Sequence, residues 1–356
     1  MKDVVVIGGG QSGLAAASAL RAEGLAPLVL EAGTEPVGSW PNYYDSLKLF
    51  SPAAYSSFPG FPFRGDPERY PARDEVVDYL RDYAATLDAD IRTRCRVTSV
   101  TPTGSRGFQV TTDTGEAIHA AGVVAATGSF GSPHIPALVG LRSFGGRLLH
   151  VADYHGPEAY VDQRVVVVGA GDSAVQVGYE LAEVAKVTIA TRHPVSFLPQ
   201  RIDGRDLHYW LERTGFDDLP PEWLARLIPH ALVTDNGRYR AAIESGRPDR
   251  RPMLTALDGE HVIWSDGTRE VVDSIVFATG YRPHVDYLDA LGALTDDGLP
   301  RHAGGISTTH PGLAYLGIEF QRSYASNTLR GVNRDAEYIA PAIAAHIRDA
   351  GALFRP

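Results

Sequence analysis

The chain has 356 residues, of which 44% are hydrophobic and 21% charged, and its formal net charge is −10. This composition predicts folded domains with a sizeable core rather than a disordered or fibrous chain, and the length favours two domains. The net negative charge, with a sequence pI of about 5.6, argues against a surface for nucleic acid or for anionic membranes.

Cys95 is the only cysteine, so a disulfide within the chain and a CxxC redox pair are excluded. We interpret Cys95 as a small, half-buried apolar side chain. The first strand is expected to begin at Asp3 or Val4, which leaves no room for a signal peptide. Because no apolar run approaches the ~18 residues of a membrane span, we expect a cytoplasmic enzyme.

Residues 3–31 contain a complete nucleotide-binding pattern. An apolar run typical of a buried parallel strand leads into a GxGxxG loop at 8–13, a helix that ends near Gly24, and a second strand. The glycines allow a tight turn, close approach of a pyrophosphate and close packing of the helix on the strand. Glu31 stands where a carboxylate accepts hydrogen bonds from ribose hydroxyls. The alternative is a parallel α/β unit without a ligand.

Residues 163–192 repeat this pattern, with a GxGxxA loop at 169–174. Arg192 follows the last residue of that loop by 18 positions, the same spacing that Glu31 has in the first unit. An acid at this position suits a free 2′-hydroxyl, whereas an arginine suits a 2′-phosphate. We therefore predict FAD in the first unit and NADPH in the second, with hydride passing from nicotinamide to flavin. The alternative for Arg192 is a surface arginine, and His193 either adds a donor to the phosphate or faces water.

Each unit is followed, at a distance, by a hairpin and a strand with the same ending. The tripeptide Ala-Thr-Gly occurs at 126–128 and again at 278–280. Asp113–Gly115 and Asp266–Gly267 are expected to supply the hairpin turns. A glycine at a strand end lets the backbone approach a bound cofactor closely.

The repeat predicts an α/β protein with two nested dinucleotide-binding, Rossmann-like domains. We expect the first part of an FAD-binding domain at 1–155, an inserted NADPH-binding domain at 156–284, and the remainder of the FAD-binding domain at 285–356. Linkers are expected near 150–160 and 281–290.

The C-terminal region is expected to return to the first domain. The stretch 337–354 is amphipathic and is interpreted as a helix packed on the body and broken by Pro341. Ser326 or Asn327 is a plausible N-cap, and a helix beginning there could face the flavin pyrimidine edge, which becomes negative on reduction. Residues 200–255 are less regular; they could cap the substrate cleft, form a dimer contact or simply pack.

Several motifs in family order make the chain resemble the class B flavoprotein monooxygenases, the flavin-containing monooxygenase family, and most closely its short, soluble bacterial members. The matching segments are GGGQSG at 8–13, GSW at 38–40, FGGRLLHVADY at 144–154, GAGDSA at 169–174 and FATGYRP at 277–283. The third segment matches the family fingerprint FxGxxxHxxx(Y/F/W) through Phe144, Gly146, His150 and Tyr154.

The resemblance implies that this fingerprint lies near the junction of the two domains and handles the bound nicotinamide cofactor. We expect Phe144 and Tyr154 to anchor its ends and Gly146 to supply backbone freedom. His150 would donate and accept hydrogen bonds across the junction; the alternative is a satisfied core histidine.

The resemblance also implies the reaction. NADPH reduces FAD, O2 adds at the flavin C(4a) carbon to give a peroxide, and bound NADP+ keeps water out. A soft nucleophile such as a sulfide or an amine then attacks the distal oxygen, with ketones as a second class through Baeyer–Villiger insertion. No acid–base dyad is required, and the sequence shows no triad or metal cluster.

Two departures from the family pattern bear on this expectation. Larger members carry an asparagine beside the flavin, where this chain has Phe50, Ser51 and Pro52, so weaker peroxide stabilisation is expected. Related Baeyer–Villiger enzymes end the fingerprint in tryptophan, so Tyr154 favours heteroatom oxygenation over ketone insertion. Arg192 predicts NADPH as the preferred donor, with NADH possible and weaker.

Three other functions share parts of this pattern. A disulfide reductase of the thioredoxin-reductase type has both nucleotide units, but a single cysteine excludes its redox pair. An NAD(P)H oxidoreductase that passes electrons to a quinone or a protein partner would consume oxygen slowly without product. A flavin redox sensor would bind FAD with negligible NADPH turnover. A homodimer is expected from the resemblance.

The candidate site residues follow from these motifs, with no metal expected. Candidate catalytic residues are His150, Phe50 and Ser51. Candidate FAD-binding residues are Gly8, Gly10, Gln11, Ser12, Gly13, Glu31, Gly38, Ser39, Trp40, Val97, Thr127, Gly128 and Ser326. Candidate NADPH-binding residues are Gly169, Gly171, Asp172, Ser173, Ala174, Arg192, His193, Thr279, Gly280 and Tyr281.

Overall fold

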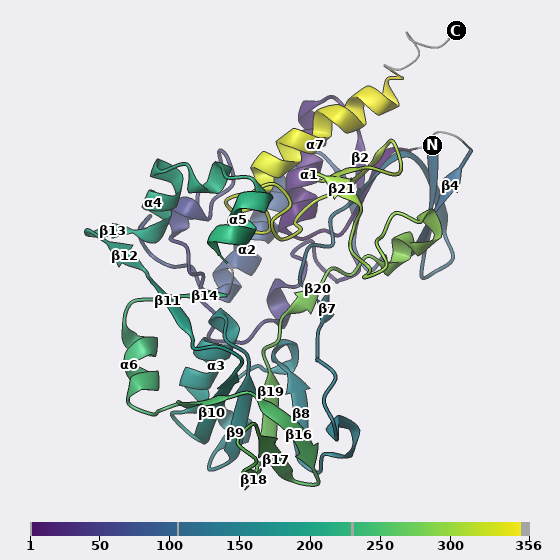
Figure 1. Ribbon diagram of the computed structural model, residues 1–356. Helices are drawn as coiled ribbons and strands as arrows, with labels where there is room; N and C mark the ends of the chain where they lie inside the picture. Colours follow the sequence, from purple (N-terminus) through teal and green to yellow (C-terminus); the bar gives the residue numbers. More distant parts are fainter. Residues whose placement is uncertain (1, 105–106, 229–230, 350–356) are drawn as a thin grey trace.

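The computed structural model describes residues 2–104, 107–228 and 231–349, and it contains two domains, each built on a large sheet (Figure 1). Strands β7 (Ser132–Pro133) and β20 (Tyr281–Arg282) pair antiparallel between the two domains. The chain leaves the first domain near β7 and returns near β20, so the second domain is inserted into the first.

In the described part of the chain, the first sheet has nine strands. Seven follow the order β21-β22-β23-β6-β1-β2-β3, while β5 pairs with β6 and β4 pairs with β5. The parallel pairs connect β1 (Lys2–Ile7), β2 (Pro27–Leu30), β3 (Asp90–Arg92), β6 (Ala117–Ala125) and β23 (Leu313–Tyr315). The antiparallel strands are β4 (Val97–Thr103), β5 (Gly107–Thr112), β21 (His302–Ala303) and β22 (Ile306–Ser307). The central parallel strands are buried on both faces, as their continuous apolar runs predict.

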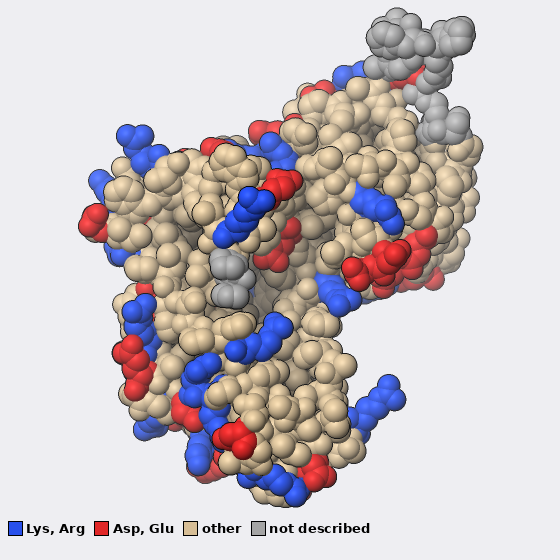
Figure 2. All heavy atoms as spheres, viewed as in Figure 1, with Lys and Arg blue, Asp and Glu red and all other residues tan. Residues whose placement is uncertain are grey.

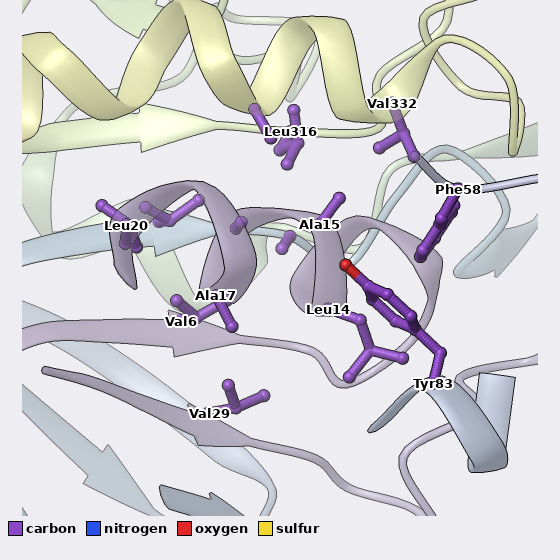
Figure 3. Close-up of a cluster of buried hydrophobic side chains, with 14 of the residues drawn as sticks. Val6, Leu14, Ala15, Ala17, Leu20, Val29, Phe58, Tyr83, Leu316 and Val332 are labelled. Carbon is purple, nitrogen blue, oxygen red and sulfur yellow. The ribbon is translucent and has the colours of Figure 1, made fainter. Parts of the chain in front are cut away.

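Three helices pack on one face of this sheet: α1 (Gln11–Ala22), α2 (Arg73–Thr86) and α7 (Val332–Ile347). Figure 3 shows α1 lying between Val6 and Val29 of the sheet on one side and Leu316 and Val332, the first residue of α7, on the other. Each fully buried aliphatic side chain of this kind contributes about 1.5–3 kcal/mol. The short helix η7 (Asp286–Leu291) lies with β4 and β5 in the core of the other face.

The second sheet is parallel throughout, in the order β15-β10-β9-β19-β8. Its strands are β8 (Arg147–His150), β9 (Arg164–Val168), β10 (Lys186–Thr191), β15 (Asp249–Pro252) and β19 (Ser274–Phe277). Helix α3 (Asp172–Leu181) packs on one face. An antiparallel sheet of β16 (Leu254–Asp258), β17 (His261–Trp264) and β18 (Arg269–Val271) packs on the other.

Residues 200–228, here called the cover segment, connect this second domain to the surface of the first. They contain β12 (Arg201–Ile202), β13 (Arg205–Asp206), α4 (Leu207–Arg213), η6 (Phe216–Asp218) and α5 (Pro221–Leu227). The parallel strands β11 (Ser196–Pro199) and β14 (Leu232–Asp235) flank the segment, and α6 (Arg238–Glu244) follows. Short 3-10 helices elsewhere are η1 (Trp40–Asn42), η2 (Ala53–Tyr55), η3 (Leu141–Ser143), η4 (Val151–Asp153) and η5 (Glu158–Tyr160).

The local elements predicted for the first unit are confirmed. Strand β1, helix α1 and strand β2 follow one another, and Gly24 ends α1 in the left-handed conformation with φ +75°. Both predicted hairpins also form, between β5 and β6 and between β17 and β18. Gly115 and Gly267 have positive φ at their turns.

The sheets place the first crossing between the domains earlier than expected. The predicted boundary at residue 155 falls after β8, yet β8 pairs with β19 in the second sheet from Arg147 to His150. The crossing therefore lies between β7 and β8, because the backbone of β8 finds its hydrogen-bonding partners in the second domain.

Two predictions about the C-terminal region are wrong. Pro341 does not break the helix, since α7 continues to Ile347 with Pro341 exposed and Ile339 and Ile343 buried against the core. Packing of this apolar face outweighs one lost backbone hydrogen bond. The part of the predicted helix beyond residue 349 lies outside the described residues.

The N-cap of α7 is also not at the predicted position. The helix begins at Val332 after Gly331, which makes no side-chain cap. Ser326 instead accepts hydrogen bonds from the backbone N–H groups of Arg322 and Ser323, both at 3.0 Å. Consecutive turns then lead to the helix, and the N–H of Thr328 donates to the carbonyl of Ala325. Ser326 is therefore a loop residue, where it satisfies the backbone before the helix starts.

Candidate active site

A cavity of about 910 Å³ lies between the two domains, and Figure 2 shows a hollow at the centre of this face. Both glycine loops reach it, and so do the cover segment and the C-terminal region. The predicted residues that line it are Gly8, Gly10, Gln11, Ser12, Glu31, Gly38, Ser39, Trp40, Phe50, Ser51, Val97, Thr127, Gly128, Gly171, Asp172, Ser173 and Tyr281. The predicted residues that are not part of its wall are Gly13, His150, Gly169, Ala174, Arg192, His193, Thr279, Gly280 and Ser326.

The first glycine loop leaves bare backbone where β1 turns into α1. A Cβ atom on Gly8, which has φ +103°, would lie 2.8 Å from the carbonyl oxygen of Ala126. A Cβ atom on Gly13 would lie 1.8 Å from the carbonyl oxygen of Gly8, so only glycine lets the helix approach the strand this closely. The N-terminus of α1 thus faces the cavity through Gly10 without an intervening side chain. This arrangement fits the pyrophosphate of a dinucleotide.

Glu31 occupies the wall of the same cavity at the end of β2. It is 7% exposed, and its two carboxylate oxygens accept hydrogen bonds from the backbone N–H groups of Gly9 and Gly33, each at 2.6 Å. These bonds fix the carboxylate, and each oxygen retains a lone pair for a ribose hydroxyl. A fixed negative charge here disfavours a 2′-phosphate, so the residues present fit FAD.

The GSW segment packs directly on the first glycine loop. The indole N–H of Trp40 donates to Oε1 of Gln11 at 3.2 Å, and Nε2 of Gln11 donates to the carbonyl of Asn327 at 2.9 Å. A Cβ atom on Gly38 would lie 2.8 Å from the Cα of Gly10. The first glycine loop, which would hold FAD, is therefore hydrogen-bonded to the C-terminal region, 316 positions away in the sequence.

The second glycine loop repeats this construction at the end of β9. A Cβ atom on Gly169 would lie 2.3 Å from the carbonyl oxygen of Ala278, and Gly171 precedes α3 as its N-cap. Arg192 and His193 follow β10 and are exposed to solvent. Their place beyond the strand end, outside the cavity wall, is compatible with contact to the 2′-phosphate of a bound NADPH.

Asp172 is the first residue of α3 and faces the cavity at the second loop. Its Oδ1 accepts a hydrogen bond from the backbone N–H of Thr234 at 3.2 Å. Burial nevertheless raises the pKa of Asp172 to about 7. The charge of this carboxylate therefore changes near neutral pH, at the helix end where a pyrophosphate would bind.

His150 lies in the core at the junction of the domains rather than on the cavity wall. It is 2% exposed, and its Nδ1 accepts a hydrogen bond from the backbone N–H of Ala152 at 3.1 Å. The ring proton is therefore on Nε2, which donates to the carbonyl of Gly280 at 3.0 Å. Burial lowers the pKa of His150, so the ring stays neutral. Its edge-to-face contact with Tyr281, at 4.8 Å between ring centroids, connects it to the cavity.

The other fingerprint residues pack around β8. The hydroxyl of Tyr154 donates to Oε2 of Glu180 on α3 at 2.7 Å, and Tyr154 is fully buried. A Cβ atom on Gly146 would lie 2.6 Å from both the carbonyl oxygen of Asp273 and the ring of Phe144. Gly146 thus permits close packing under the Phe144 ring, and we correct the expectation that it supplies backbone freedom.

Phe50 and Ser51, two of the candidate catalytic residues, lie on the cavity wall. Phe50 is 39% exposed, and Ser51 shares a 2.8 Å hydrogen bond with the hydroxyl of Ser56. The sequence analysis missed Tyr44, whose hydroxyl donates to Oε1 of Gln176 at 2.6 Å between the two domains. Tyr44 and Gln176 both line the cavity. No local signal marks this pair, because its partners lie 132 positions apart.

The described ranges contain neither a candidate metal site nor a candidate membrane-spanning helix. No group of three or more His, Cys, Asp or Glu residues there has an arrangement that could hold a metal ion. In the same part of the chain, no helix is both long and apolar enough to cross a membrane.

Cys95 is half-buried, and burial raises the pKa of its thiol.

The comparisons with known proteins agree with this geometry. Residues 5–214 match the family described as "Pyridine nucleotide-disulphide oxidoreductase". A flavin-containing monooxygenase from Stenotrophomonas maltophilia is 33% identical, with a TM-score of 0.85 over 97% of this chain and 99% of that chain. An uncharacterized CzcO-like oxidoreductase from Geobacillus kaustophilus is 32% identical over 97% of this chain and 99% of its own length. The rice indole-3-pyruvate monooxygenase YUCCA1 is 28% identical over 79% and 77%.

Two nested nucleotide-binding domains and these matches define a two-dinucleotide-binding flavoprotein. More specifically, the chain belongs to the class B flavin-containing monooxygenases, which are FAD-dependent NAD(P)H monooxygenases. FAD and NADPH are the cofactors of this family. The first glycine loop, together with Glu31, fits FAD.

Proposed function

We propose that the protein uses NADPH and O2 to oxygenate a soft nucleophile, a thioether or an amine. The observation that carries the proposal is that both glycine loops open into one cavity of about 910 Å³. Bound FAD would supply the chemistry that activates O2, and the C(4a)-peroxyflavin route implied by the family is part of this proposal. A shared cavity supports it because nicotinamide and flavin must meet for hydride transfer.

The residues of this chain support the proposal through binding and exclusion of water. The N-terminus of α1 and Glu31 would hold FAD, while α3 and Arg192 would hold NADPH. Phe50, Tyr44 and Tyr281 give the cavity aromatic walls. Such walls accommodate an apolar thioether and displace water from the reacting atoms. Tyr154 at the end of the fingerprint favours a heteroatom substrate over a ketone.

The experiment is a product balance with the purified FAD-loaded enzyme, NADPH and methyl phenyl sulfide. We expect methyl phenyl sulfoxide as the main product, in a ratio to NADPH consumed that is below one because weaker peroxide stabilisation releases part of the oxygen as hydrogen peroxide. A matched cyclic ketone should be converted more slowly. Consumption of NADPH with hydrogen peroxide as the product, or only with an added quinone, would instead support the electron-transfer alternative. Bound FAD with negligible NADPH turnover would support the redox sensor.

A further inference from the structure

Asp206, on the cover segment, is the centre of a buried hydrogen-bond network. Its Oδ1 accepts bonds from the backbone N–H and from Nδ1 of His208, both at 2.8 Å. Its Oδ2 accepts bonds from the hydroxyl of Tyr70 at 2.5 Å and from Nε2 of Gln200 at 2.8 Å. The side chains of Asp206 and His208 are 8% and 1% exposed. Four donors on one buried carboxylate make a rigid group. We call Tyr70, Gln200, Asp206 and His208 the wall network.

Two members of the wall network, Gln200 and His208, contact Phe50 directly. Nε2 of Gln200 also donates to the backbone carbonyl of Phe50, at 3.1 Å. The imidazole of His208 stacks on the Phe50 ring, with 5.9 Å between centroids and 24° between planes. His208 also contacts the Tyr55 ring, with 6.0 Å between ring centroids. Main chain and ring of Phe50 are therefore both fixed by groups that belong to the cover segment.

Phe50 connects the wall network to the reaction cavity. It is a large apolar side chain, 39% exposed, and it is one of the residues that line the cavity. Tyr70 and Phe50 belong to the first domain, whereas Gln200, Asp206 and His208 come from the inserted second domain. The wall network thus couples the position of an aromatic wall residue to the docking of the cover segment.

We propose that the buried Asp206–His208 pair is a positioning device that holds Phe50 against the reaction cavity, excludes water there and forms the apolar surface on which the organic groups of the substrate pack. This inference rests on the proposed oxygenase function for its substrate class. Neither Asp206 nor His208 lines the cavity, so they act through Phe50 and not on the reacting atoms.

The main test is Asp206→Asn in the FAD-loaded enzyme. Asparagine keeps the shape but has a single acceptor oxygen, so it cannot accept all four bonds: its NH2 group displaces either the donors Tyr70 and Gln200 or the two donors of His208. We expect sulfoxide formed per NADPH to fall roughly threefold to tenfold, and the reduced flavin to be reoxidised by O2 several-fold faster. Anaerobic flavin reduction by NADPH and FAD content should stay within about twofold.

Two variants of His208 separate the hydrogen bond from the ring contact. His208→Phe keeps an aromatic ring on Phe50 but lacks the donor to Asp206, whereas His208→Asn keeps a donor and loses the ring. Both should lower the yield of sulfoxide per NADPH, because Phe50 needs both contacts. Glu68→Gln is the matched control: it removes only an exposed ion pair with Arg201 nearby and should change neither readout.

A double variant shows whether the network acts through Phe50. In a Phe50→Leu background, Asp206→Asn should have no further effect on the yield or on the reoxidation rate. Additive effects of the two substitutions, or unchanged yield and reoxidation in Asp206→Asn, would overturn the inference. If the unmodified enzyme forms no sulfoxide, the oxygenase proposal fails separately, and the reoxidation rates of the same variants still decide the role of the network.

Discussion

Arg192 follows β10 at the position where Glu31 follows β2 in the other domain. We predict that Arg192→Ala lowers kcat/KM for NADPH by roughly 10–100-fold, because a charged hydrogen bond to the 2′-phosphate contributes about 1.5–3 kcal/mol. Because NADH has no 2′-phosphate, kcat/KM for NADH should change little. Steady-state kinetics with both donors is the measurement.

Arg142→Ala provides a control for Arg192, because Arg142 is another exposed arginine of the inserted region. An equal loss for NADPH and NADH in Arg192→Ala would contradict the assignment of the phosphate site. A loss in Arg142→Ala would point to a general charge effect.

We predict that Asp172 makes NADPH binding depend on pH. Its pKa is raised by burial to about 7, so the carboxyl is mostly neutral below pH 7 and ionised above it. An ionised carboxylate beside the pyrophosphate repels it, so affinity should fall as pH rises from 6 to 8, by roughly threefold to tenfold. Asp172→Asn should remove this fall and tighten binding at pH 8.

Titration of flavin-absorbance changes with NADP+ and with NAD+ would measure the effect of Asp172. Using both ligands controls for the 2′-phosphate, which itself titrates near pH 6. A pH dependence that persists in Asp172→Asn with NAD+ would assign the effect to another group.

The cover segment is attached to the C-terminal region by two ion pairs of different burial. Asp217 pairs with Arg330, with side chains 8% and 9% exposed, whereas Asp218 pairs with Arg334, with side chains 63% and 55% exposed. Removing one partner of a buried pair leaves an uncompensated charge and costs about 3–5 kcal/mol, while an exposed pair contributes at most about 1 kcal/mol.

We therefore predict that Asp217→Ala destabilises the protein strongly and Asp218→Ala only slightly. Urea unfolding of the FAD-loaded protein, followed by tryptophan fluorescence, would compare the two. Equal shifts of the unfolding midpoint would show that burial of the Asp217–Arg330 pair does not control the docking of the cover segment.

Elements whose conformation depends on neighbouring residues could be predicted from the sequence. The loop at 8–13 and the turn at Gly115 depend on backbone angles and close contacts within a few positions. Pro341 shows the limit, because a local helix-breaking rule lost to the burial of Ile339 and Ile343.

Much of the candidate site depends on contacts between distant positions, which no local pattern encodes. Tyr44 meets Gln176 across 132 positions, and Tyr70 meets Asp206 across 136. The glycines of both nucleotide-binding loops, together with Glu31 and Arg192, could be named from spacing, since each belongs to one βαβ unit. The aromatic wall and the wall network could not, since they arise where two domains pack together.

At the scale of the whole molecule, one nucleotide-binding domain is inserted into the other, and the glycine loops of both domains line a single cavity. The chain crosses between them at β7 and β20, and the cavity lies beside this connection. The arrangement would give both cofactors access to one shared cavity, where an organic substrate and O2 would also enter. We propose that a substrate bound in this cavity receives one oxygen atom from O2.

An isotope experiment tests that claim most directly. The FAD-loaded enzyme would react with NADPH and methyl phenyl sulfide under 18O2 in ordinary water, and mass spectrometry would read the sulfoxide. The account predicts one 18O atom in nearly every sulfoxide molecule and added catalase that changes neither yield nor label. Sulfoxide that lacks the label, or that disappears when catalase removes free hydrogen peroxide, would contradict it.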